Sequence, residues 1–263
     1  MVRLASGIVM AALLLALILY GSVFHFFIFC LVVATLGAHE FFSMLKAGRR
    51  PAPALAGVPA AAALAAALYS GASPWPMAAI LGLFILGLAV SLTGPEGKRM
   101  ETGANLVYGA MFTGAPMAAL ALVRAQDGGA AYVVMLITAT ALCDTGAYYT
   151  GRKWGKRKLA PALSPGKTVE GFIGGVAGAM AGAFIVWWLF NPPFGPMDAA
   201  VCGLIAGFLG PVGDLAESAI KRDTGVKDSG AIIPGHGGVL DRADSLLFTS
   251  AAFYLFLQLR AAL

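Results

Sequence analysis

The polar residues between Ser218 and Ser245 are unusual in a chain that is otherwise mostly apolar. They form the segment SAIKRDTGVKDSGAIIPGHGGVLDRADS, with cations at Lys221, Arg222 and Lys227 and a Gly-His-Gly-Gly run at 235–238. Two carboxylates follow, Asp241 and Asp244, and a helix beginning near Leu240 would place them one turn apart. Cations, glycines and carboxylates in one segment suit a polyphosphate and a metal ion. We therefore expect the chemistry of this protein here.

Two more carboxylates lie just upstream, where an apolar run ends. Asp214, Glu217 and Ser218 stand at positions i, i+3 and i+4 and would share one helix face. Hard cations such as Mg2+ take oxygen ligands and bridge carboxylates to phosphates. Asp214 and Asp241, from two different helices, are our first-choice ligands, followed by Asp244 and Glu217. The sequence leaves a second metal ion open.

Asp144 lies inside another apolar run, in the segment CDTGAYYTGRKWG. Tyr148 and Gly151 follow at i+4 and i+7, so the three residues would lie along one helical stripe. Hydrocarbon offers a lone carboxylate no partner, and we therefore predict a polar cavity around Asp144. A purely structural aspartate, held by Thr or Tyr hydroxyls, is the alternative. Asp144 is a candidate metal ligand or catalytic residue.

The basic loop after this segment ends in LSPGKTVEGFIGG, which contains Gly-Lys-Thr. A P-loop is excluded, because its first glycine would fall at Pro161 and no strand is expected before it. Ser164, Lys167, Thr168 and Glu170 still offer phosphate-binding and helix-capping groups where the next helix begins. The alternative is a basic loop that only sets membrane orientation; it explains 152–158 better than it explains 164–171.

Three stretches together resemble the phosphatidate cytidylyltransferases, also called CDP-diacylglycerol synthases. The first is Ser-x-Ile-Lys-Arg-x4-Lys-Asp-x-Gly-x2-Ile-Pro-x-His-Gly-Gly-x2-Asp-Arg-x-Asp at 218–244. The others are Asp-Thr-x-Ala-Tyr-x-x-Gly-Arg from Asp144 and Ser-Pro-x-Lys-Thr-x-Glu-Gly from Ser164. Ala243 and Gly166 depart from the family pattern, which has a larger apolar and a basic or polar residue there. The resemblance covers about the C-terminal half of the chain.

The resemblance implies that CTP and phosphatidate react to give CDP-diacylglycerol and pyrophosphate, with Mg2+ as cofactor. The expected catalytic residues are Asp144, Asp214, Lys221 and Asp241, and the expected metal ligands are Asp144, Asp214, Asp241 and Asp244. The expected substrate-binding residues are Ser164, Lys167, Thr168, Arg222, Lys227, His236, Gly237, Gly238 and Arg242. Membrane lipids are expected partners, nucleic acid is not, and a homodimer is left open.

Composition defines an integral membrane protein. Of 263 residues, 59% are hydrophobic and only 12% are charged, and the mean hydropathy is +0.81, whereas about a quarter of the residues in soluble domains are charged. Three cysteines within apolar runs indicate neither disulfides nor a thiolate metal site. We predict an all-α fold of about nine transmembrane helices, forming one domain over 1–263 with its catalytic motifs in 144–245. The apolar segments are 4–20, 23–45, 54–70, 75–92, 104–123, 130–150, 171–190, 197–217 and 243–259.

The positive-inside rule supports this count. With nine spans, only Arg124 and Arg260 of the 18 cations fall on the side opposite to the others. We therefore predict a cell (inner) membrane protein with a cytoplasmic N-terminus, an external C-terminus and an active site facing the cytoplasm. The net charge of +5 is explained by orientation, which argues against nucleic acid. The first apolar run resembles a signal peptide, but another run follows at once, and we expect a retained span.

Other functions stay open at this point. A CTP-dependent polyprenol kinase or a CDP-archaeol synthase-like enzyme would share similar spans and metal carboxylates, although the intact 218–244 pattern argues against both. An ion-coupled transporter would use buried carboxylates, but no inverted repeat is visible. His39 and Glu40 are candidates by their depth in the membrane. Because Glu40 at the interface, paired with Lys46, explains them equally well, we leave both out of the site.

Overall fold

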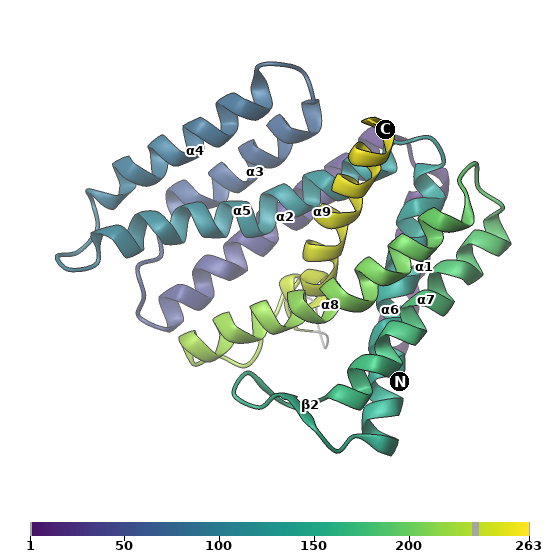
Figure 1. The fold of residues 1–263 in the computed structure, drawn as a ribbon. Coiled ribbons are helices and arrows are strands. Elements are labelled where there is room, and N and C mark those ends of the chain that lie inside the picture. The colour runs from purple at the N-terminus through teal and green to yellow at the C-terminus, as the bar shows by residue number, and fades with distance from the viewer. Residues whose placement is uncertain (1, 233–236, 263) are drawn as a thin grey trace. The chain divides into compact units, whose positions relative to one another are not determined.

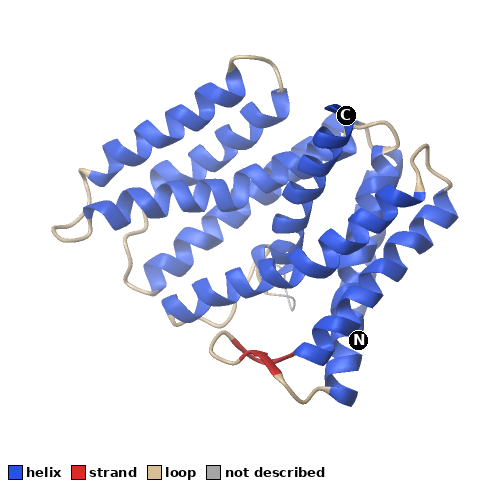
Figure 2. Cartoon of the chain, viewed as in Figure 1, coloured by secondary structure: helices blue, strands red, loops and turns tan. Residues whose placement is uncertain are grey.

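The computed structural model describes residues 2–232 and 237–262. This part of the chain is almost entirely helical, with one two-stranded hairpin (Figures 1 and 2). Its nine helices are α1 (Val2–Tyr20), α2 (Val23–Ala47), α3 (Ala54–Ser70), α4 (Trp75–Ser91), α5 (Arg99–Arg124), α6 (Gly129–Trp154), α7 (Val169–Phe190), α8 (Pro196–Thr224) and α9 (Leu240–Ala262).

The helix positions agree with the predicted apolar segments. Each of the nine segments falls on its own helix, and only the fourth extends past its helix end, by one residue. Within the described residues, six helices are long and apolar enough to cross a membrane: α2, α5, α6, α7, α8 and α9. The other three form shorter apolar helices. An all-α polytopic membrane protein is therefore confirmed, while nine crossings stay a prediction.

A small hairpin in the basic loop corrects the prediction at one point. Strands β1 (Lys158–Ala160) and β2 (Ser164–Thr168) pair in antiparallel register, so a strand does precede Lys167. The Gly-Lys-Thr sequence lies within β2 itself, directly before α7. A P-loop would instead place these residues in a loop between a strand and a helix. The P-loop is still excluded, but not because strands are missing.

The chain forms two compact units that alternate along the sequence. The first unit comprises the start of α1, Ser22–Leu122 and Ile220–Ala243. The second comprises Met10–Gly21, Val123–Ala219 and the chain from Asp244 onward. The prediction of a single domain stays a prediction.

Aromatic side chains and glycines form the interior of the first unit. Phe41 and Phe42 are 2% and 1% exposed, and a Cβ atom at Gly109 would lie only 2.7 to 2.8 Å from their rings. The ring of Phe42 likewise occupies the position that a Cβ atom at Gly57 would need, where α2 packs against α3. Because lipid tails are as apolar as phenylalanine, these contacts stabilise through close packing rather than through removal from water.

Helices α6 and α7 pack closely in the second unit, and glycines make this possible. A Cβ at Gly178 would collide with the carbonyl of Leu142, and one at Gly182 would lie 3.0 Å from the carbonyl of Thr138. Gly174 approaches Thr150 of α6 in the same way, so small residues on α7 form the face that packs against α6. The pairing is antiparallel, so the C-terminal half of α6 lies beside the start of α7 (Figure 1).

The two cations expected on the opposite membrane side have partners within the second unit. Arg260 in α9 pairs with the buried Asp198 of α8 and also donates to the Tyr132 hydroxyl of α6. Arg124 donates to the carbonyls of Ile18 and Gly21, at the C-terminal end of α1. A cation there complements the negative end of the helix dipole. Both arginines therefore hold helices together, whatever their role in orientation.

Candidate active site

One cavity in the second unit collects many of the predicted site residues. It has a volume of about 530 Å3, within the range of about 300 to 1,000 Å3 that is usual for ligand sites. Three elements supply its walls: the C-terminal half of α6, the hairpin with the start of α7, and the middle of α8. Its lining includes Asp144, Tyr148, Arg152, Ser164, Gly166, Lys167, Thr168, Pro211 and Asp214.

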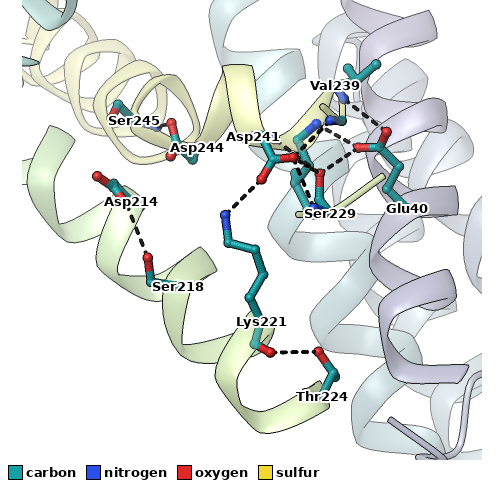
Figure 3. A network of polar contacts seen from close by, with 12 residues as sticks. Glu40, Asp214, Ser218, Lys221, Thr224, Ser229, Val239, Asp241, Asp244 and Ser245 are labelled. Atoms are coloured by element: carbon teal, nitrogen blue, oxygen red, sulfur yellow. Dashed lines mark hydrogen bonds and ion pairs between the residues drawn. The ribbon is translucent and has the colours of Figure 1, made fainter. Parts of the chain in front are cut away.

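Lys167 and Asp214 form an ion pair across this cavity. The Lys167 ammonium lies 2.7 Å from Asp214 Oδ2, and it also approaches the carbonyl of Pro211 at 3.5 Å. Ser218 donates to the other oxygen, Oδ1, at 3.3 Å (Figure 3). The side chains of Lys167 and Asp214 are 24% and 33% exposed, so both can be reached by a ligand in the cavity.

Asp144 lines the same cavity, as the sequence predicted. Two carboxylates, one from α6 and one from α8, therefore line the cavity together with the ammonium group of Lys167 from β2. This arrangement provides both positive and negative groups in one cavity, which suits an anionic ligand that carries a metal ion.

The start of α7 is fixed by the two residues that were predicted to cap it. Thr168 is the N-cap, and its hydroxyl oxygen accepts the backbone N–H of Gly171 at 3.1 Å. Glu170 accepts the backbone N–H groups of Lys156 and Arg157 and the side chain of Arg157, at 2.9 to 3.1 Å. Glu170 thus joins α7 to the end of the basic loop and holds the hairpin, with Lys167, at the cavity.

The oxygen groups of this cavity fit a Mg2+ ion. Mg2+ is usually bound by one or two carboxylates together with water and substrate phosphates, not by a complete protein cage. Asp144 and Asp214 provide two such carboxylates. Among residues 2–232 and 237–262, no cluster of three or more His, Cys, Asp or Glu side chains that could hold a metal is present.

A second polar group lies in the first unit, at the start of α9. The Lys221 ammonium lies 2.8 Å from Asp241 Oδ1 (Figure 3). Asp241 Oδ2 accepts the backbone N–H and the hydroxyl of Ser229 and the backbone N–H of Gly238, at 2.9 to 3.0 Å. The Lys221 and Asp241 side chains are 16% and 12% exposed. Asp241 therefore fixes both a lysine and the loop before α9.

The glycines of this segment make room for protein carboxylates. A Cβ at Gly238 would collide with the Ser229 hydroxyl and would lie 2.6 Å from Glu40 Oε2. Gly237 has a positive φ of 83°, which favours glycine, and its Cβ would lie 3.0 Å from Asp241 Oδ2. Gly237 and Gly238 are expected among the substrate-binding residues, and in this structure the backbone of Gly238 approaches protein carboxylates.

The remaining predicted residues have different surroundings. Arg222, Lys227 and Arg242 are exposed residues of the first unit, and His236 lies outside the described residues. In the second unit, Asp244 accepts the backbone N–H of Ser245 at 2.6 Å, and Glu217 is fully buried. Asp214 and Asp241 belong to different units, and their joint binding of one cation stays a prediction.

Glu40 is the residue that the sequence analysis wrongly left at the membrane interface. It is only 2% exposed and accepts the backbone N–H groups of Val239 and Leu240 at 3.0 and 2.8 Å. The expected pairing with Lys46 is therefore not the role of this side chain. The partners of Glu40 lie about 200 positions later in the chain. In the sequence, the one indication of its role was a carboxylate near the end of an apolar segment.

The fold and the cavity together define a polytopic membrane protein with a cavity lined by lysine, arginine and aspartate side chains. Comparison with known proteins is more specific. The chain matches the cytidylyltransferase family over residues 1–260 and belongs to that family. The resemblance predicted from the sequence patterns is confirmed.

Individual relatives agree with this assignment. The chain is 39% identical over 189 residues to the uncharacterized protein YnbB of Escherichia coli (strain K12), covering 68% of this chain and 61% of that protein. It is 40% identical over 178 residues to a phosphatidate cytidylyltransferase of Brucella suis biovar 1 (strain 1330), covering 67% and 64%. With the Bacillus subtilis (strain 168) phosphatidate cytidylyltransferase it shares 46% identity over 128 residues, covering 49% and 46%. The chain thus spans less than two thirds of the length of these relatives.

Proposed function

We propose that this protein is a phosphatidate cytidylyltransferase, which converts CTP and phosphatidate into CDP-diacylglycerol and pyrophosphate. The observation that carries the proposal is the cavity that contains the ion pair of Lys167 with Asp214 and is also lined by Asp144. Relatives named phosphatidate cytidylyltransferase share 40 to 46% identity with the matched segments, which supports the same substrates.

The reaction joins two anionic molecules, so binding and charge neutralisation are the main tasks of the protein. An oxygen of the lipid phosphate attacks the α-phosphorus of CTP, and the bond between the α-phosphorus and the bridging oxygen of the β-phosphate breaks. Pyrophosphate leaves with that bond's electron pair. Lys167 holds a phosphate group in the cavity, and Ser164 and Arg152 offer further donors along its wall.

Asp144 and Asp214 are the residues that would hold Mg2+ in this cavity, and Asp241 and Asp244 remain candidate ligands from the sequence pattern. When bound, the ion would neutralise negative charge on the phosphates of CTP. Asp214 also orients Lys167 through their ion pair. Lys221, held by Asp241, offers a second ammonium group for a phosphate.

The acceptor lipid distinguishes this proposal from related reactions. Purified protein with radiolabelled CTP should form a chloroform-soluble cytidylyl product when phosphatidate is added. Neither polyprenol nor an unsaturated archaeal ether lipid phosphate should replace phosphatidate. Transfer of label from the γ-phosphorus of CTP to polyprenol would instead support the kinase, and a cytidylyl product that requires the ether lipid would support the CDP-archaeol synthase-like enzyme.

We further propose nine membrane crossings, with the cavity on the cytoplasmic side of the cell membrane. The grouping of cations supports this orientation, because the basic loop at 152–158 leads directly into the cavity-lining hairpin. A single cysteine introduced into that loop should react with an impermeant maleimide only after the cells are opened, and one placed after Arg260 should react in intact cells. The native cysteines are buried and serve as the background control. Labelling of both sites from the same side would contradict the nine crossings.

A further inference from the structure

We propose that Glu40 is a positioning residue that holds Asp241 and Lys221 in place through Ser229 and the start of α9. Glu40 is not among the site residues predicted from the sequence. It belongs to α2, far along the chain from the other site residues. The inference deepens the proposed function, because it assigns a supporting residue to the same reaction. All the residues that carry it lie within the first unit.

The surroundings of Glu40 show how strongly its carboxylate is held. Oε1 accepts the Val239 N–H, and Oε2 accepts the Leu240 N–H and lies 3.1 Å from the Ser229 hydroxyl (Figure 3). Leu240 is the first residue of α9 and Val239 directly precedes it, and free N–H groups at a helix start favour a negative charge. A carboxylate in the buried interior of a membrane protein is costly without such partners. Glu40 therefore fixes the position of the first turn of α9 relative to α2.

The Ser229 hydroxyl connects Glu40 to the Asp241 carboxylate. Its oxygen lies 3.1 Å from Glu40 Oε2 and 2.9 Å from Asp241 Oδ2, and it also accepts the Asp241 backbone N–H at 3.3 Å. A serine hydroxyl has one proton, so it donates to only one of these two carboxylates at a time. Asp241 in turn pairs with Lys221. One continuous set of contacts thus runs from Glu40 to the Lys221 ammonium.

The glycines around Glu40 indicate that the chain is arranged for this contact. A Cβ at Gly230 would lie 2.5 Å from Glu40 Oε1, and one at Gly238 would lie 2.6 Å from Oε2. If α9 needed only a cap, a local Ser, Thr, Asp or Asn would supply it, as happens in most helices. Here a carboxylate from a distant helix enters a space left free by two glycines and reaches the residues that hold Asp241. This arrangement favours positioning of the site over capping alone.

The test compares Glu40→Gln with Glu101→Gln, a matched change in the same unit. Glu101 forms an exposed ion pair with Arg50 at 3.3 Å and lies outside the site. Glu40→Gln keeps the size of the side chain but places an NH2 group toward N–H donors. We expect kcat for CTP and phosphatidate to fall about tenfold to a hundredfold, as is usual when a supporting contact of a site is lost. The KM for CTP should change little, and the melting temperature should fall because a buried N–H donor loses its acceptor, while the protein stays folded at the assay temperature. Glu101→Gln should behave as wild type.

A second pair of variants keeps the test valid if Glu40→Gln does not fold. Ser229→Ala removes only the hydroxyl between the two carboxylates, and Ser43→Ala removes a hydroxyl that bonds to a carbonyl within α2. Ser229→Ala should lower kcat without changing KM, and Ser43→Ala should not. Amide hydrogen exchange in the first turn of α9 should be faster in Glu40→Gln than in wild type. The exchange measurement does not depend on enzymatic activity.

The outcomes separate the inference from the proposed function. An active wild type with unchanged kcat in Glu40→Gln and Ser229→Ala would overturn the inference and leave the function standing. A loss of activity that matches the loss of folded protein would reduce Glu40 to a structural residue and also overturn it. A wild type that does not use CTP and phosphatidate would overturn the proposed function, and unchanged exchange at the start of α9 would then overturn the positioning role independently.

Discussion

Asp214→Asn is expected to lower CTP turnover by about a thousandfold or more, in line with the loss of a charge that acts directly on the reacting phosphates. Asparagine keeps the size of the side chain but removes the charge that pairs with Lys167 at 2.7 Å. A neutral amide is also a poor ligand for Mg2+. The protein should still insert and purify, because Asp214 is partly exposed to the cavity rather than packed in the interior. Steady-state kinetics over a range of Mg2+ concentrations measures the effect.

Two matched Asp→Asn changes in the second unit serve as controls. Asp127 is exposed in a turn, and its replacement should change neither activity nor stability. Asp198 is 4% exposed and pairs with Arg260, so its replacement should lower the melting temperature and the activity together. If Asp214→Asn behaves like Asp198→Asn, or if chelating Mg2+ leaves the wild type active, Asp214 is not part of a catalytic metal site.

Asp241→Asn is expected to lower turnover by about a hundredfold to a thousandfold, a loss comparable to that of one preorganised polar contact in an active site. Its carboxylate accepts four contacts, from Lys221, from two groups of Ser229 and from Gly238. An amide can satisfy only some of these donors, because its NH2 group must face either the ammonium or the N–H groups. We also expect a loss of about 1 to 3 kcal/mol in the free energy of unfolding, since a donor is left without an acceptor.

The exposed Asp223 near the end of α8 provides the control, and Asp223→Asn should leave activity and melting unchanged. Full activity in Asp241→Asn would refute a role in the reaction. The double variant of Asp214 and Asp241 adds a further test. Residues that act as a unit show strongly non-additive effects, so the double variant should be little worse than the poorer single variant. If the fold-loss of turnover in the double variant equals the product of the two single losses, the two carboxylates act independently.

The helices were predictable because their signal is local. An apolar run of about 20 residues indicates a membrane helix without any knowledge of its neighbours. The ends were less predictable, because a helix continues beyond the apolar run into polar residues. The apolar run at 243–259 belongs to a helix that runs from Leu240 to Ala262. The start near Leu240 was expected from the positions of Asp241 and Asp244, although the apolar run begins only after Asp241. Hydropathy marks the lipid-facing part of a helix and not its N-terminus.

The hairpin and the Glu40 contacts were not predictable for two different reasons. Strand β1 has three residues and β2 has five, and the segment includes Pro165 and Gly166, which normally argue against a strand. Glu40 is predictable as an unusual side chain, but its partners are set by how α2 packs against the start of α9. The packing of two helices so far apart along the chain cannot be read from a single sequence. Most polar cavity residues were found because two short patterns, beginning at Asp144 and Ser164, each carry several polar residues at fixed spacing. Asp214 was found as a carboxylate at the end of an apolar run.

The fate of the phosphorus atoms of CTP tests the central claim most directly. Purified protein is incubated with phosphatidate and Mg2+ and with CTP labelled at either the α- or the γ-phosphorus. We expect the α-label to enter the chloroform-soluble lipid in equal amount to the pyrophosphate released, and the γ-label to appear only in pyrophosphate. Transfer of the γ-label to lipid would show a kinase, and release of either label without a labelled lipid would contradict cytidylyl transfer.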